Sequence, residues 1–107
     1  MAEESKCVEI MVGPDLYMYR IVSRKGFEQK VEELRILTEE EYSKAIKLLK
    51  NNGYEAHPAK FIHPKAPTLG GFIFYEVDDK TLNELSKMGK IINPKNEEGE
   101  SPQAVQA

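Results

Sequence analysis

The chain is poor in the residue types that build disulfides, metal centres and nucleophilic sites. It contains one cysteine, two histidines and no tryptophan in 107 residues. The single cysteine, Cys7, excludes an internal disulfide and a multi-cysteine metal site, and we expect it to be a small buried residue. His57 and His63 would lie about 20 Å apart on an extended chain, and no third ligand accompanies them. We therefore expect no metal and no cofactor.

The sequence also lacks the common signatures of enzymes and of membrane or exported proteins. It has no phosphate-binding loop, no G-x-S-x-G and no H-E-x-x-H. Glu76, Asp78 and Asp79 are close enough in sequence to bind a divalent ion, but helix capping explains the two aspartates more simply. No apolar run is long enough to cross a membrane, and residues 1–6 do not resemble a signal peptide. These absences predict a cytoplasmic protein that is not an enzyme.

Charge is unevenly distributed along the chain. The net charge is −3, of which residues 1–6 contribute −1 and residues 93–107 contribute −2, so residues 7–92 are neutral. A basic surface would therefore have to come from local clustering. The composition predicts a flexible arm over residues 1–6, one domain over residues 7–92, and a disordered acidic tail over residues 93–107.

Gly70–Val77 is the strongest strand signal. As a strand it places Phe72 and Phe74 on one face and Ile73, Tyr75 and Val77 on the other, so both faces are apolar and a central strand is expected. Leu16–Ser23 is a second strong strand, joined to Cys7–Val12 by a short turn that predicts a hairpin. We expect Gly70–Val77 and Leu16–Ser23 to be neighbours at the centre of the sheet.

Two helices are predicted from capping residues and apolar periodicity. Thr38 and Glu41 form a capping box, and Gly53 ends the helix that follows. Asp78 or Asp79 caps a second helix that runs to about Met88.

The remaining segments are assigned with the same rules. Residues 54–62 are expected to form an edge or bulged strand interrupted by Pro58, residues 63–69 a loop, and residues 90–92 a short last strand. Residues 27–37 fit either a helix, from the spacing of Phe27, Val31 and Leu34, or a strand over their second half. We favour the strand, since it leads directly into the Thr38 cap.

This element order predicts an α+β fold of the ferredoxin-like type. From Leu16 onward the order is βαββαβ, in an antiparallel sheet extended by additional N-terminal strands. Two helices would cover one face, and the other face would be open to solvent or to a partner.

The aromatic strands are similar to a known RNA-binding signature. In the RNA-recognition-motif family, aromatic residues on two central strands stack on bases. Residues 70–77 resemble its longer signature at Gly71, Phe72 and Phe74, and depart from it at Gly70, Ile73 and Val77. Residues 16–21 are similar to its shorter signature, with Tyr17 at the stacking position. The resemblance implies a platform for single-stranded RNA or DNA.

Several interpretations of these residues stay open. Alternating aromatics on strands usually reflect core packing, which would turn Phe72 and Phe74 toward the helices. Basic residues near the ends of strands, with Phe27 beside one group of them, are either phosphate contacts or ordinary solvated surface. The candidate nucleic-acid-binding residues are Tyr17, Tyr19, Arg20, Arg24, Lys25, Lys60, Lys65, Phe72 and Phe74. The alternative function is a protein-interaction module, either a homodimer or a subunit of a larger complex, and neither function involves a membrane.

Overall fold

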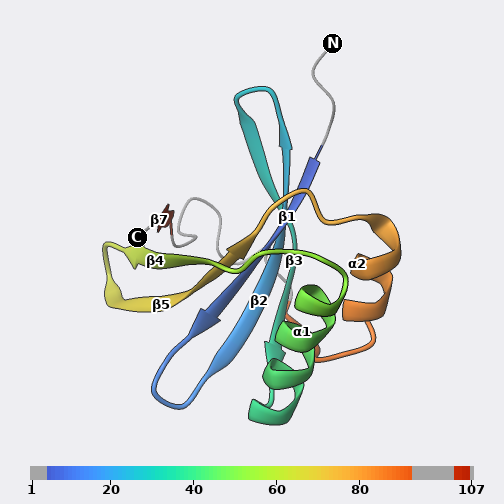
Figure 1. Cartoon of the computed structure of the whole chain (residues 1–107). Helices are drawn as coiled ribbons and strands as arrows, with labels where there is room; N and C mark the ends of the chain where they lie inside the picture. Colours follow the sequence, from blue (N-terminus) through green and yellow to red (C-terminus); the bar gives the residue numbers. More distant parts are fainter. Residues whose placement is uncertain (1–4, 93–102, 107) are drawn as a thin grey trace.

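The structure is a computed structural model that describes residues 5–92 and 103–106. Within them, seven strands form one antiparallel sheet and two helices lie on one of its faces (Figure 1). This confirms the predicted α+β class with an antiparallel sheet. The elements are β1 Ser5–Val12, β2 Tyr17–Lys25, β3 Glu28–Leu37, α1 Glu39–Asn51, β4 His57–His63, β5 Ala66–Phe74, α2 Asp79–Leu85, β6 Lys90–Ile92 and β7 Gln103–Gln106.

The strand order does not fit a four-stranded ferredoxin-like sheet. The order is β6-β3-β2-β1-β5-β4-β7. The run β3-α1-β4-β5-α2-β6 has the predicted βαββαβ sequence of elements, but β1 and β2 lie between β3 and β5. The N-terminal hairpin therefore occupies the middle of the sheet instead of extending its edge.

The centre of the sheet is β1, and the predicted pairing of Gly70–Val77 with Leu16–Ser23 is wrong. β1 pairs with β2 on one side and with β5 on the other. Its residues 7–11 are all buried, because apolar side chains alternate onto both faces and only Glu9 interrupts them. A strand that is apolar on both faces suits the middle of a sheet, where both faces can be buried.

Several strand boundaries differ from the prediction. β3 covers almost all of residues 27–37, because Gly26 and Phe27 form a two-residue turn that pairs Lys25 with Glu28. β5 begins at Ala66, within the predicted loop, and pairs with β4 from there. It ends at Phe74, and soon after it Glu76 adopts a left-handed backbone conformation with φ of 50°.

The first helix forms as predicted. Thr38 Oγ1 accepts from the Glu41 amide at 3.1 Å, and the Glu41 carboxylate accepts from the Thr38 amide at 3.0 Å. The same carboxylate also accepts from the Gly89 amide at 2.8 Å. These backbone donors hold the pKa of Glu41 below its usual value. The cap of α1 therefore also fixes the turn that leads into β6.

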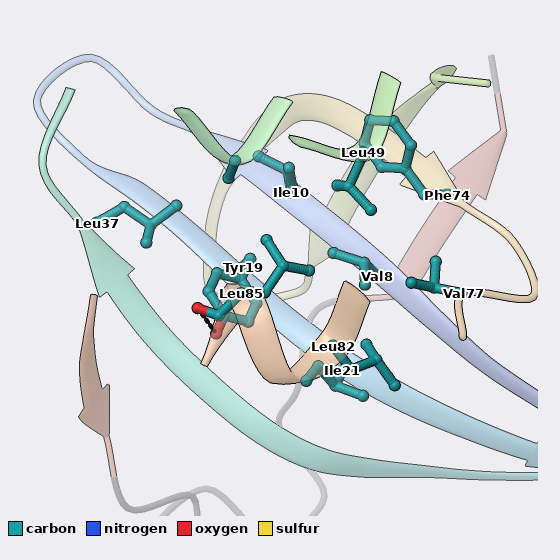
Figure 2. Packing of buried hydrophobic residues seen from close by; sticks show 11 residues of the cluster. Val8, Ile10, Tyr19, Ile21, Leu37, Leu49, Phe74, Val77, Leu82 and Leu85 are labelled. Atoms are coloured by element: carbon teal, nitrogen blue, oxygen red, sulfur yellow. Dashed lines mark hydrogen bonds between the residues drawn. The ribbon is translucent and has the colours of Figure 1, made fainter. Parts of the chain in front are cut away.

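The main core lies between the sheet and the helices. On this helix-covered face, Val8, Ile10, Tyr19 and Phe74 are completely buried (Figure 2). Leu49 of α1 and Leu85 of α2 pack onto them from the helix layer.

The second face of the sheet carries a smaller buried cluster. It consists of Cys7, Met11, Leu34, Ala59, Phe61 and Ile73. The guanidinium of Arg20 on β2 lies 5.7 Å from the ring centre of Phe61 on β4. These strands are three inter-strand spacings apart, about 14 Å in a flat sheet. The Arg20 and Phe61 side chains therefore reach toward each other across β1 and β5 on this face, and the sheet between them is twisted (Figure 1).

The predicted arm and tail fall largely outside the described residues. Ser5 and Lys6 begin β1, and Gln103–Gln106 form β7 beside β4. The structure does not describe residues 1–4, 93–102 and 107. In the described part of the chain, neither helix is long and apolar enough to cross a membrane.

Candidate nucleic-acid interface

The predicted stacking residues all lie on the helix-covered face. Tyr19 and Phe74 are 0% exposed, and the Tyr19 hydroxyl donates to the Leu85 carbonyl at 3.0 Å (Figure 2). Tyr17 stacks on Tyr42 of α1 with ring centres 4.6 Å apart. Phe72 packs against the same cluster and is partly buried. The alternative in which these aromatics are core residues is therefore confirmed.

This placement removes the flat platform from the candidate site. Neither ring of Tyr19 and Phe74 has a face open to a base, and exposing them would require moving the helices. Burial also raises the pKa of the Tyr19 phenol. The sheet face opposite the helices carries the buried side chains of Met11, Phe61 and Ile73, not these four aromatics.

Arg20 is also unavailable as a surface phosphate contact. It is 6% exposed and forms an ion pair with Glu9, its cross-strand neighbour on β1. The pair lies on the second face, where the guanidinium covers Phe61. Glu9 thus neutralises one of the five basic side chains that were predicted to contact phosphates.

The two predicted basic clusters lie at opposite ends of the sheet. Arg24 pairs with Ser5 at the start of β1. Lys60 pairs with Gly70, which in turn pairs with Val12 at the end of β1. Seven residues of strand separate Ser5 and Val12, a distance of about 23 Å. The clusters therefore do not flank one common surface.

Lys60 and Lys65 belong to the β4–β5 hairpin. Both residues are exposed. The amide of Lys65 donates to Nδ1 of His63 at 3.0 Å, so the histidine helps to shape this turn. This hairpin carries no exposed aromatic residue. In this respect it differs from the basic cluster on the β2–β3 hairpin, which includes the exposed Phe27.

The β2–β3 hairpin brings Arg24, Lys25 and Lys30 together with Phe27. It extends beyond the helices at the top of Figure 1. Gly26 has φ of 61° at the first central position of the two-residue turn, and Phe27 follows it. Glycine at that position is typical of a type II′ turn, whose twist matches that of the flanking strands. All seven residues from Arg24 to Lys30 are exposed.

The cations of this hairpin keep their charge available. Residues 24–30 contain three cations and one carboxylate, a net of +2 (3 − 1). With the Gln29 amide in its hydrogen-bonding orientation, its oxygen accepts from Arg24 at 2.8 and 3.1 Å. This neutral partner orients the guanidinium without cancelling its charge. Arg24, Lys25 and Lys30 form no ion pair with any residue that the structure describes.

Phe27 could have been recognised from the sequence as a turn residue. Gly-Phe between two alternating segments is a two-residue hairpin signal. The helical spacing of Phe27, Val31 and Leu34 competed with that signal and obscured it. Val31 instead pairs with Val22, and Leu34 with Arg20, on the second face.

The described residues contain no group of three His, Cys, Asp or Glu side chains arranged to hold a metal. The predicted lack of a metal or cofactor stays a prediction.

Comparisons of the chain with protein-family models, curated proteins and solved structures gave no match. The case for a function therefore rests on the geometry of the β2–β3 hairpin.

Proposed function

We propose that this protein is a small cytoplasmic accessory protein, without enzymatic activity, that binds nucleic acid through its β2–β3 hairpin. The observation that carries the proposal is the exposed hairpin tip, where Arg24, Lys25 and Lys30 surround Phe27 with no carboxylate ion-paired to them among the described residues. Guanidinium and ammonium groups are the usual donors to phosphate oxygens.

The number of cations sets the expected salt dependence. Neutralising three phosphates of a single strand releases counterions with a slope of about −2 in log K against log salt. The association constant should then fall by about 20-fold between 50 and 200 mM salt. A protein of this kind would bind weakly, in the micromolar range at low salt.

Fluorescence anisotropy with a labelled single-stranded oligonucleotide tests the proposal. Lys25→Gln should weaken binding at 50 mM salt and reduce the salt slope by about 0.7. Lys47→Gln is the matched control, because Lys47 is an exposed lysine on α1, away from the hairpin. Equal effects of the two substitutions, or no binding by the unaltered protein at 50 mM salt, would contradict the proposal.

One observation favours a protein-interaction function as the second candidate. β6 pairs only with residues 34–36 of β3, so no described strand covers the outer edge of β3 from Glu28 to Glu33. An uncovered edge can accept a strand from a second copy of the chain. Size-exclusion chromatography with light scattering tests this candidate. A dimer that persists at high salt would support it, and a monomer at every concentration would contradict the homodimer and leave only a subunit of a larger complex.

A further inference from the structure

Phe27 is the one large apolar side chain in the described residues that has no contact with the rest of the protein. Its relative exposure is 106%, whereas the other exposed large apolar residues lie between 37% and 57%. Burying a phenylalanine side chain would stabilise the fold by about 1.5–3 kcal/mol. Phe27 contributes none of this, and the type II′ turn requires only the glycine before it. The fold therefore gives no reason for an aromatic residue at this position.

The turn fixes the backbone position from which the ring projects. Lys25 and Glu28 pair across the two-residue loop, so the backbone of Phe27 is fixed by the ladder on both sides. Because the backbone is already fixed, binding would restrict only the two side-chain torsions of the phenylalanine. Arg24 and Lys30 are each three residues from Phe27, or about 10 Å along their strands. One exposed ring is thus flanked by cations on both strands of the ribbon, with Lys25 and Lys30 on one face and Arg24 on the other.

We propose that Phe27 stacks on an unpaired base while the surrounding cations contact the adjoining phosphates, so that single-stranded nucleic acid is the preferred ligand. This inference rests on the proposed function and specifies its substrate class. Stacking on an aromatic side chain needs only the π-face that every base has, so little sequence preference is expected.

The hairpin tip suits an unpaired base better than it suits a membrane or a duplex. Phe27 is the only apolar side chain from Arg24 to Lys30, which is too little apolar surface to anchor the protein in a bilayer. A duplex is also disfavoured, because inserting the ring between paired bases costs a few kcal/mol of unstacking. Three cations supply little to offset that cost.

The test compares Phe27 variants on matched single-stranded and duplex oligonucleotides at 50 mM salt. Phe27→Ala should weaken single-strand binding by about 5- to 150-fold. Phe27→Trp should retain the affinity, and Phe27→Leu should lose most of it, because leucine is apolar but cannot stack. Ile62→Ala is the matched control, since Ile62 is a half-exposed apolar residue on β4. It should leave binding unchanged.

The outcomes separate this inference from the proposed function. If Lys25→Gln weakens binding and Phe27→Ala does not, the hairpin contacts only the phosphate backbone of the oligonucleotide. The stacking inference is then wrong. If Phe27→Ala weakens duplex binding as much as single-strand binding, the ring does not select unpaired bases. If the unaltered protein binds neither oligonucleotide, the proposed function fails as well. Thermal unfolding of each variant should match the unaltered protein, because the Phe27 ring contacts nothing that folding requires.

Discussion

Replacing Gly71 by alanine should destabilise the fold strongly, whereas the same change at its neighbour Gly70 should not. A Cβ atom on Gly71 would lie 1.8 Å from the carbonyl oxygen of Ile10 and 2.9 Å from Cε2 of Phe61. A Cβ atom on Gly70 would meet nothing within 4 Å. The two positions are adjacent on β5, so each serves as the control for the other.

The magnitude follows from what would have to move. The Phe61 ring can shift by a few tenths of an ångström, but the Ile10 carbonyl belongs to β1, the central strand, and Met11 beside it pairs with Gly71. Overpacking in a core costs about 1–3 kcal/mol, and a clash with fixed backbone lies at the top of that range. We expect Gly71→Ala to cost about 3 kcal/mol. Gly70→Ala should stabilise by about 0.4–1 kcal/mol, because alanine restricts the unfolded chain.

Urea and thermal unfolding followed by circular dichroism measure both variants. A loss of 3 kcal/mol corresponds to a decrease of roughly 12–24 °C in Tm for a domain of this size. A second variant, Gly71→Ala with Phe61→Leu, separates the two contacts. It relieves the ring contact but not the carbonyl contact, so most of the loss should remain. Equal stability of Gly70→Ala and Gly71→Ala would refute the predicted close approach of β5 to β1.

Two further stability predictions concern buried polar groups. Glu9→Gln should cost about 3–5 kcal/mol in urea unfolding, because it leaves the buried Arg20 guanidinium without a counter-charge, and Glu9→Leu with Arg20→Met should recover much of that loss. Tyr19→Phe should cost about 1 kcal/mol near neutral pH, since it removes the hydrogen bond to Leu85. Burial raises the pKa of Tyr19 in the folded state, so its stabilising contribution is complete below the unfolded pKa of about 10 and decreases as pH rises above it. The slope of unfolding free energy between pH 10 and 11, about 1 kcal/mol per pH unit at most, should be smaller in Tyr19→Phe.

The elements that were predicted correctly are those determined by local residues. The Thr38–Glu41 capping box and the periodic apolar residues after it specify α1 without any long-range contact. The β1–β2 hairpin similarly follows from a short turn between two alternating segments. The strand order depends instead on which edges of these units meet, and the apolar pattern of β5 would have suited β2 as well as β1. Local sequence cannot choose between such neighbours.

The orientation of the aromatic residues was ambiguous for a related physical reason. Phe72 and Phe74 alternate with Ile73 and Tyr75, so each face of β5 offers comparable apolar area to a helix layer. The choice depends on the register with β1, in which Phe74 lies beside Val8 and Ile73 beside Glu9. Glu9 therefore lies on the face that the helices do not cover, and its cross-strand partner Ile73 lies on the same face.

The buried Glu9–Arg20 pair explains how two similar faces are kept distinct. Without it, β1 and β2 would present apolar side chains on both faces, and a slip of one residue would exchange the faces at little cost. Glu9 and Arg20 are direct cross-strand partners, so a slip would separate them and leave two buried charges uncompensated. That penalty is several kcal/mol even where the pair itself adds little net stability. We infer that the ion pair fixes the register, which keeps Tyr19 and Phe74 under the helices and leaves the hairpin tip as the exposed aromatic site.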